Sequence, residues 1–406
     1  MYNNKLHNTI IFVIVAVFYS YILSYAYNYS GFLVLTLGIA LFLALIYQKS
    51  LNYIAGLPLY RWILFYLVVN LIWMILPHSH ATPQNISDIA IAVVYIFSLT
   101  TLFYFDDNRL TIVRTTILVI TLIGVFNHIY EFFNPEIFFS FDSKTKVVGR
   151  SSGLYGNSNG AAEVLILGMI LSYGIVPQKF KALFLITVLL GIIPTFSRSG
   201  IVSWFLVVFI LTATKVINKK IATTIALVVL FSVVIALPIL ISFIGFSLEE
   251  EAENILSRLD FFSSKSNTIS DGSAQDRFLV ARAAFDYFSD SPFFGAGHSF
   301  TYHWEYTIST HNIYLSLMAE YGLLGIFIYP LLVLSIIWKA QGEARQTGIA
   351  FATFLLVIGF VTHNVLEGFH TLLAIAAMSS WIYKSRTYSE ELYLTKADLI
   401  TMERKV

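Results

Sequence analysis

Residues 180–213, FKALFLITVLLGIIPTFSRSGIVSWFLVVFILTA, consist of two apolar runs joined by a short turn around Arg198. A helix needs about 20 apolar residues to cross roughly 30 Å of hydrocarbon. The runs 180–196 and 199–213 approach this length, and the turn between them is too short to hold a folded loop. This stretch predicts two neighbouring transmembrane helices and therefore an all-α membrane protein.

The whole chain has the composition of such a protein. Of its 406 residues, 57% are hydrophobic and 12% are charged, and the mean hydropathy is +0.75, whereas soluble domains are about 25% charged. Similar apolar runs recur along residues 1–406, which predicts a single integral membrane domain with about twelve transmembrane helices. The expected spans are 9–28, 31–47, 60–77, 88–105, 111–133, 160–176, 180–196, 199–213, 221–246, 312–338, 347–363 and 366–383.

The distribution of basic residues predicts the orientation. Lys and Arg are retained preferentially in cytoplasmic connections, and most of the 25 basic residues fall on the same side as the two termini if the chain crosses twelve times. Both termini are therefore expected in the cytoplasm. The exceptions lie on three outward connections and point to where charge is needed for function: Lys144, Lys146, Arg150, Arg198, Arg258, Lys265, Arg277 and Arg282.

The largest outward segment, residues 247–310, is expected to form a small helical periplasmic cap between the ninth and tenth spans. Acidic residues after Ser247 favour one helix start, and Ser273-Ala-Gln-Asp276 resembles a capping box at a second. Phe278, Phe285 and Phe288 recur at helical spacing in the second helix, which Pro292 ends. This helix is predicted to be amphipathic and to lie on the membrane surface.

Two short outward stretches contain candidate binding residues. In GRSSGLYGNSNG, residues 149–160, glycines and a helix N-terminus could bind an anion; an ordinary turn with a cap explains the pattern equally well. In the turn around Arg198, no acidic residue is close in sequence. A positive charge near hydrocarbon costs energy unless it has a partner, so Arg198 is a candidate for binding an anionic substrate.

A third stretch runs from Gln275-Asp-Arg277 through Pro292-Phe-Phe-Gly-Ala-Gly297 to His311-Asn312. His311 stands where the cap re-enters the membrane. An imidazole with an ordinary pKa near 6.5 can act there as a neutral base, although a hydrogen-bonding anchor is the commoner role. His363 and Asn364, expected near the outer end of the eleventh span, could line the same space or simply pack the helix end.

Several absences narrow the chemistry. The chain has no cysteine, and its net charge of +1 gives no reason to expect a nucleic-acid partner. No paired carboxylate of the kind used in metal-dependent sugar transfer stands on an outward loop, and no phosphate-binding Gly-Lys motif is present. We therefore expect no metal and no cofactor, and a substrate that arrives already activated.

Residues 145–330 resemble the O-antigen ligase and O-antigen polymerase superfamily of bacterial surface-polysaccharide assembly. The residues that carry the resemblance are, in order, Arg150 to Asn159, Ser197-Arg198-Ser-Gly200, Arg277 with the following helix to Gly297, His311-Asn312-Ile-Tyr-Leu315 and Glu320-Tyr-Gly322-Leu-Leu-Gly325. The ordered set carries the resemblance rather than any single piece.

The resemblance implies transfer of a glycan from an undecaprenyl-diphosphate carrier to an acceptor hydroxyl at the periplasmic face of the bacterial inner membrane. By position, the catalytic residues would be His311 as general base and Arg198 and Arg277 on the donor diphosphate. Guanidinium groups stabilise such a leaving group without a metal. The expected substrate-binding residues are Arg150, Asn159, Arg282 and Asn312.

The acceptor is left open by the sequence, because a ligase would use lipid A-core, a polymerase another carrier-linked glycan and a protein glycosylase a protein. A protein glycosylase would more often have a longer periplasmic part at its C-terminus. The chain carries no Lys or Arg between Gly297 and His311, unlike some ligases of this type. Membrane lipids surround the protein, and the resemblance allows contacts with other polysaccharide-assembly proteins. The alternative is a lipid-linked oligosaccharide flippase, which should carry ionisable residues at the membrane midplane and internal repeats.

Overall fold

The computed structural model describes residues 2–22, 38, 41, 57–134, 150–231 and 272–403, except 77, 81, 105, 106, 156 and 307. Every regular element in these residues is helical, which confirms the all-α prediction. The α-helices are α1 (Tyr2–Ser20), α5 (Pro58–Ile75), α6 (Pro83–Tyr104), α7 (Asp107–Phe133), α8 (Ser158–Ser172), α9 (Lys181–Ile192), α10 (Arg198–Ala213), α11 (Lys219–Phe231), α14 (Gly272–Asp290), α15 (Phe300–His303), α16 (Ile313–Tyr321), α17 (Gly325–Ile337), α18 (Gly342–Ile358) and α19 (Phe369–Glu403).

Six helical segments are long and apolar enough to cross a membrane: Pro58–Ile75, Asn85–Tyr104, Asn108–Phe133, Ser158–Ile175, Gln178–Thr195 and Ile313–Ile337. The chain is thus a multi-pass membrane protein. The count of twelve spans stays a prediction, since the span expected at 31–47 and the far half of 221–246 lie outside the described residues. The expected span 312–338 is two helices, α16 and α17, joined by a 3₁₀ turn at Gly322–Leu324.

Helix α8 forms the centre of the bundle. Twelve of its 15 residues are buried, and it packs against α7, α9, α10, α18 and α19. A helix that is apolar on all sides is stable only when other helices or lipid cover it. The first part of α19 is equally enclosed, with Leu372 to Ser380 buried. Helix α8 and the start of α19 both contribute side chains to the wall of the cavity described below.

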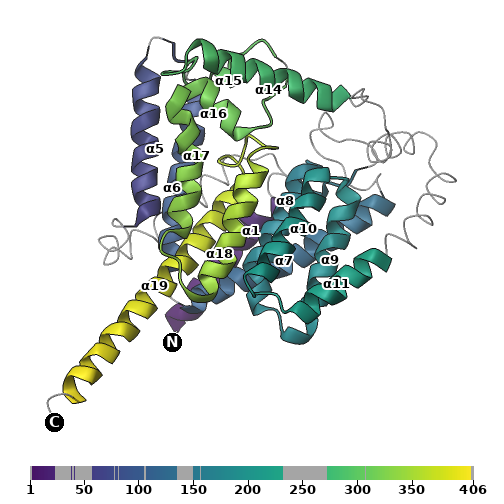
Figure 1. The fold of residues 1–406 in the computed structure, drawn as a ribbon, viewed down its shortest axis with the longest axis vertical. Helices are drawn as coiled ribbons and strands as arrows, with labels where there is room; N and C mark the ends of the chain where they lie inside the picture. The colour runs from purple at the N-terminus through teal and green to yellow at the C-terminus, as the bar shows by residue number, and fades with distance from the viewer. Residues whose placement is uncertain are drawn as a thin grey trace.

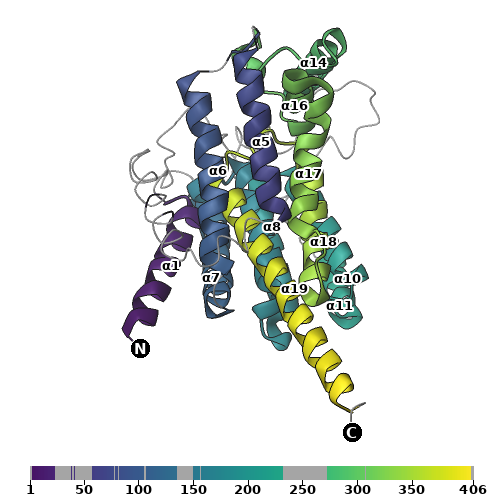
Figure 2. The same cartoon turned by 90° about the vertical axis from the view of Figure 1, so that its left-hand side faces the viewer.

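Helix α14 crosses one end of the bundle, where it packs against α16, while the start of α1 and the end of α19 lie at the opposite end (Figures 1 and 2). The predicted helix before Pro292 is thus confirmed. Its face toward the protein is Val280, Ala283 and Ala284, whereas Phe278 and Phe285 are exposed. The rest of the expected cap, residues 247–271, lies outside the described residues, and contact of α14 with a membrane stays a prediction.

The connection between α18 and α19, residues 359–368, corrects two expected boundaries. Helix α18 ends at Ile358 and α19 begins at Phe369, so His363 lies between helices and not at the end of one. The chain leaves the helix at Gly359, where a Cβ atom would come within 2.7 Å of the Tyr329 ring. We call residues 359–368 the outer connection, because the sequence predicts this end of the eleventh span on the outward side of the membrane. The outer connection lies beside the residues that enter α16.

Candidate active site

His311 lies at the point where the chain enters α16. Its backbone is left-handed, with φ of 47°, a conformation that costs a non-glycine residue about 1–3 kcal/mol and that is concentrated at functional sites. Asn312 caps α16, because its side chain accepts a hydrogen bond from the amide of Leu315 at 3.1 Å. Asn312, which the sequence analysis expects to bind substrate, therefore stabilises the start of α16 and the backbone next to His311.

The outer connection brings a second histidine to His311. The amide of Ile313 donates to the carbonyls of Gly359 and Thr362, at 2.9 and 3.0 Å. These bonds tie the start of α16 to the outer connection. As a result, the rings of His311 and His363 lie edge to face, with centroids 5.6 Å apart and planes at 83°.

The surroundings of this pair favour neutral imidazoles. Burial lowers the pKa of His311, and the positive charge of Arg277 on α14 lowers it further. Burial, with the adjacent His311, lowers the pKa of His363 to about 4. Both rings are therefore uncharged near pH 7 and can accept a proton. Arg277 is close enough to His311 to act on it electrostatically, although the two are far apart in sequence.

A cavity of about 230 Å³ opens beside His311. We call it the His311 cavity. Its wall comes from α8, from the outer connection and from the start of α19, and it is rich in hydrogen-bonding side chains. The lining residues are Tyr21, Tyr155, Asn157, Asn159, Gly160, Glu163, His311, Val361, Thr362, His363, Asn364, Glu367, Gly368, His370 and Thr371. Two predicted site residues, Asn159 and His311, thus share one cavity.

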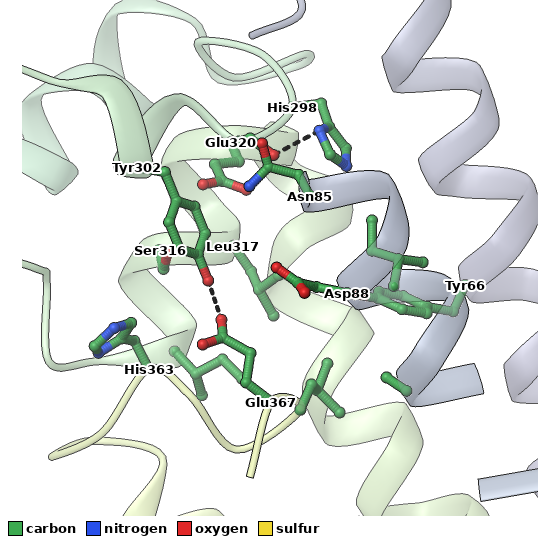
Figure 3. Close-up of a pocket in the computed structure, with 15 residues that line it drawn as sticks. Tyr66, Asn85, Asp88, His298, Tyr302, Ser316, Leu317, Glu320, His363 and Glu367 are labelled. Atoms are coloured by element: carbon green, nitrogen blue, oxygen red, sulfur yellow. Dashed lines mark hydrogen bonds between the residues drawn. The ribbon is translucent and has the colours of Figure 1, made fainter. Parts of the chain in front are cut away.

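A second cavity, of about 90 Å³, adjoins the first and shares the residues His363 and Glu367 with it. We call it the Glu320 cavity. In Figure 3 the side chains of Tyr302, Asp88 and Glu367 converge on it, and the Tyr302 hydroxyl donates to the Glu367 carboxylate. The other lining residues are Tyr66, Asn85, Ile89, Ala92, His298, Ser299, Ile313, Ser316, Leu317, Glu320 and Leu366.

His298 holds one wall of the Glu320 cavity in place. Its Nε2 lies 3.1 Å from Oδ1 of Asn70, which also accepts from the Tyr321 hydroxyl at 2.8 Å. Its Nδ1 lies 2.7 Å from the Ser299 hydroxyl. Because Asn70 Oδ1 can only accept, the proton of His298 is on Nε2 and Nδ1 accepts from Ser299. Sequence reasoning could assign His298 no role, because its partner Asn70 is distant along the chain.

Arg150 joins two of the predicted stretches. Its Nε donates to the carbonyl of Thr195 at 2.8 Å, and its Nη2 donates to Oδ1 of Asn159 at 3.0 Å. The Thr195 carbonyl belongs to the turn that precedes Arg198, the first residue of α10. Within that turn Phe196 is left-handed, with φ of 47°. Arg150 therefore clamps the turn before Arg198 to a wall residue of the His311 cavity.

The glycine-rich stretch 149–160 binds an internal carboxylate. Glu131 on α7 is buried and accepts hydrogen bonds from the amides of Ser152 and Gly153, at 2.8 and 2.6 Å. Gly153 has φ of +56°, and a Cβ atom there would come within 2.8 Å of the His128 ring. These two amides are thus occupied by a carboxylate of the chain itself and are not available to a substrate anion.

The glycines of the third stretch allow two predicted motifs to pack backbone against backbone. The amide of Ala296 donates to the carbonyl of Ala319 at 2.7 Å, and the amide of Leu323 donates to the carbonyl of Pro292 at 2.7 Å. A Cβ atom on Gly322 would lie 2.5 Å from the Pro292 oxygen. The stretch 292–297 and the end of α16 therefore form one unit, which positions α14 above the site.

The predicted residues thus fall into two groups. The first is His311 and Asn159, which line the His311 cavity, with Arg277, whose charge acts on His311. The second is Arg150 and Arg198 at the turn before α10, which Arg150 links to Asn159. Arg282 is exposed on α14. His363 and Asn364, for which the sequence allowed either a cavity or a packing role, both line the cavity. Glu367 also lines it, and no motif around this carboxylate in the outer connection could have predicted that.

Residues 182–329 match the family model described as O-antigen ligase. This part of the chain is similar to O-antigen ligases. The resemblance to the O-antigen ligase and polymerase superfamily is therefore confirmed, and the chain is similar to membrane glycosyltransferases of that type. The match contains Arg198, Arg277, Arg282 and the His311-Asn312 pair, whereas Arg150 and Asn159 precede it. No curated protein matches the chain.

Proposed function

We propose that this O-antigen ligase-type protein transfers a glycan from undecaprenyl diphosphate to an acceptor hydroxyl at the periplasmic face of the bacterial inner membrane. His311 is the general base, and Arg198 and Arg277 bind the donor diphosphate. The observation that carries the proposal is the position of His311 on a polar cavity, next to Arg277, with a lowered pKa.

The chemistry is an inverting displacement. The acceptor oxygen attacks the anomeric carbon and forms the new glycosidic bond, while His311 takes the proton of the acceptor hydroxyl. The bond between the anomeric carbon and the phosphate oxygen breaks, and its electron pair leaves with the undecaprenyl diphosphate. Guanidinium groups on the diphosphate stabilise the negative charge that develops there, which is the largest single contribution in many enzymes.

The charge of Arg277 fits both proposed roles, the binding of the diphosphate and the action of His311 as a base. Burial lowers the pKa of His311, and the Arg277 charge that would stabilise a diphosphate lowers it further, so the base is deprotonated at neutral pH. Arg150 supports the turn before Arg198 through the Thr195 carbonyl. In this proposal Arg150 and Asn159 position the donor site, and Arg282 and Asn312 contribute to substrate binding less directly.

The decisive experiment is transfer by the purified full-length chain in proteoliposomes, with a carrier-linked glycan as donor and either lipid A-core or a second carrier-linked glycan as acceptor. Wild-type protein should form product without added divalent metal, with inversion at the anomeric carbon. The His311→Ala variant should insert and fold but lose transfer. Full activity of that variant, or loss of wild-type activity on chelation, would refute the mechanism.

A further inference from the structure

The Glu320 cavity has a different chemical character from the region around Arg277. Three carboxylates line it, those of Asp88, Glu320 and Glu367, and its described lining includes neither Lys nor Arg. Burial and the charge of Asp88 raise the pKa of Glu367 to about 7. A phosphate group would meet repulsion here with no compensating cation, so this cavity cannot share the role of holding the donor diphosphate.

The remaining wall is suited to a sugar ring. Two aromatic side chains, Tyr66 and Tyr302, provide flat apolar surface, and the Ser316 hydroxyl and the Asn85 amide provide neutral hydrogen-bonding groups. At about 90 Å³ the cavity far exceeds the roughly 10–15 Å³ that one water needs, so it is hydrated when free. Sugar hydroxyls can replace such waters while keeping their hydrogen bonds.

The position of the cavity matches the geometry of an inverting reaction. The acceptor must approach the anomeric carbon from the side opposite the leaving diphosphate. His363 and Glu367 form the wall common to both cavities, and His363 touches His311 edge to face. A hydroxyl that enters from the Glu320 cavity past His363 therefore reaches the proposed base. In the proposed reaction the donor diphosphate then lies on the opposite side of the anomeric carbon.

We infer that the Glu320 cavity is the acceptor subsite, and that it binds the terminal sugar of the acceptor as a neutral or amino sugar without a phosphate near the reacting hydroxyl. The assignment to the acceptor rests on the proposed function. Asp88 is a positioning residue that accepts hydrogen bonds from the acceptor sugar. The subsite excludes acceptors whose reacting sugar is phosphorylated.

Two measurements on the full-length chain in nanodiscs test this inference. The first is binding by saturation-transfer NMR of methyl α-glucoside, methyl α-glucosaminide and glucose 6-phosphate. The methyl glycosides should bind and the sugar phosphate should not. Asp88→Asn should weaken methyl glycoside binding about tenfold, as expected for a lost hydrogen bond to a charged group, while Ser87→Ala, exposed on the same helix, should leave binding unchanged.

The second measurement is steady-state transfer. Asp88→Asn and Tyr302→Phe should raise the acceptor KM while the donor KM stays at the wild-type value. Glucose 6-phosphate binding as tight as that of the methyl glycosides, or an unchanged acceptor KM in both variants, would overturn the inference. If wild-type protein transfers nothing but loses methyl glycoside binding on Asp88→Asn, the sugar site stands and the proposed function fails.

Discussion

The ring of His311 meets the ring of His363 edge to face, with centroids 5.6 Å apart. This contact joins the start of α16 to the outer connection and places the proposed base, which lines the His311 cavity, against His363, which lines both cavities. It depends on two backbone hydrogen bonds from Ile313. The contact therefore links the local backbone geometry to the proposed transfer reaction.

Removal of the His311 imidazole should abolish base catalysis. We expect His311→Ala to lower kcat by about 10²–10⁴-fold, the usual contribution of a positioned general base, with little change in the donor KM. His303→Ala is the matched control, because His303 is exposed on α15 and lines neither cavity. An equal loss of activity in both variants would mean that the effect of His311→Ala is not specific.

The pH profile should report the charge of Arg277. Since the pKa of His311 is below its ordinary value of 6.5, wild-type kcat/KM should hold through neutral pH and fall only below 6.5. Arg277→Gln removes a positive charge that disfavours the imidazolium, so it should raise the pKa of His311 and move this acid limb to higher pH. Arg282→Gln removes the same charge from an exposed site on α14 and should leave the acid limb in place, whatever its effect on rate.

Arg198 should not be replaceable by lysine. A lysine keeps the charge but not the two parallel donors that bind a diphosphate. We expect Arg198→Lys to insert normally and to lose about 10–100-fold in kcat/KM, the size of one charged hydrogen bond. Membrane insertion is checked by size-exclusion of the solubilised protein. Wild-type turnover in Arg198→Lys would remove this residue from the site.

The Arg150 clamp should appear as coupling between two residues. Arg150→Ala and Asn159→Ala each break the 3.0 Å bond between their side chains, so their effects on unfolding free energy should not add. A double-mutant cycle should give a coupling energy of about 0.5–3 kcal/mol. Additive effects would show that the bond between the two side chains contributes nothing to stability.

Gly297 should tolerate no side chain. Its φ is +108°, and a Cβ atom would collide with the backbone oxygen of His78, so Gly297→Ala should destabilise the protein by at least about 2 kcal/mol. Gly160 on α8 has no heavy atom within 4 Å of the same position. Gly160→Ala should therefore raise stability by up to about 1 kcal/mol. Thermal unfolding in detergent compares the two variants, and a stable Gly297→Ala would contradict the proposed backbone packing.

Hydropathy and the order of the motifs were enough to predict the all-α fold, the end of α14 and the superfamily. The apolar runs predicted the helices, since membrane crossing depends on length and polarity alone, and the all-α fold is confirmed. Pro292 predicted the end of α14 correctly, because proline cannot continue a helix. The ordered motifs around Arg198, Arg277 and His311 indicated the superfamily, which is also confirmed.

Only the tertiary structure decided which side chains meet. The contacts of His311 with His363 and of His298 with Asn70 join helices and loops far apart in sequence, and no periodicity encodes such pairs. The amides of Ser152 and Gly153 could bind a substrate anion or a carboxylate of the chain itself. Glu131 occupies them, because packing places α7 there. Sequence patterns determine where a helix forms, whereas partners across a core depend on how all the helices pack together.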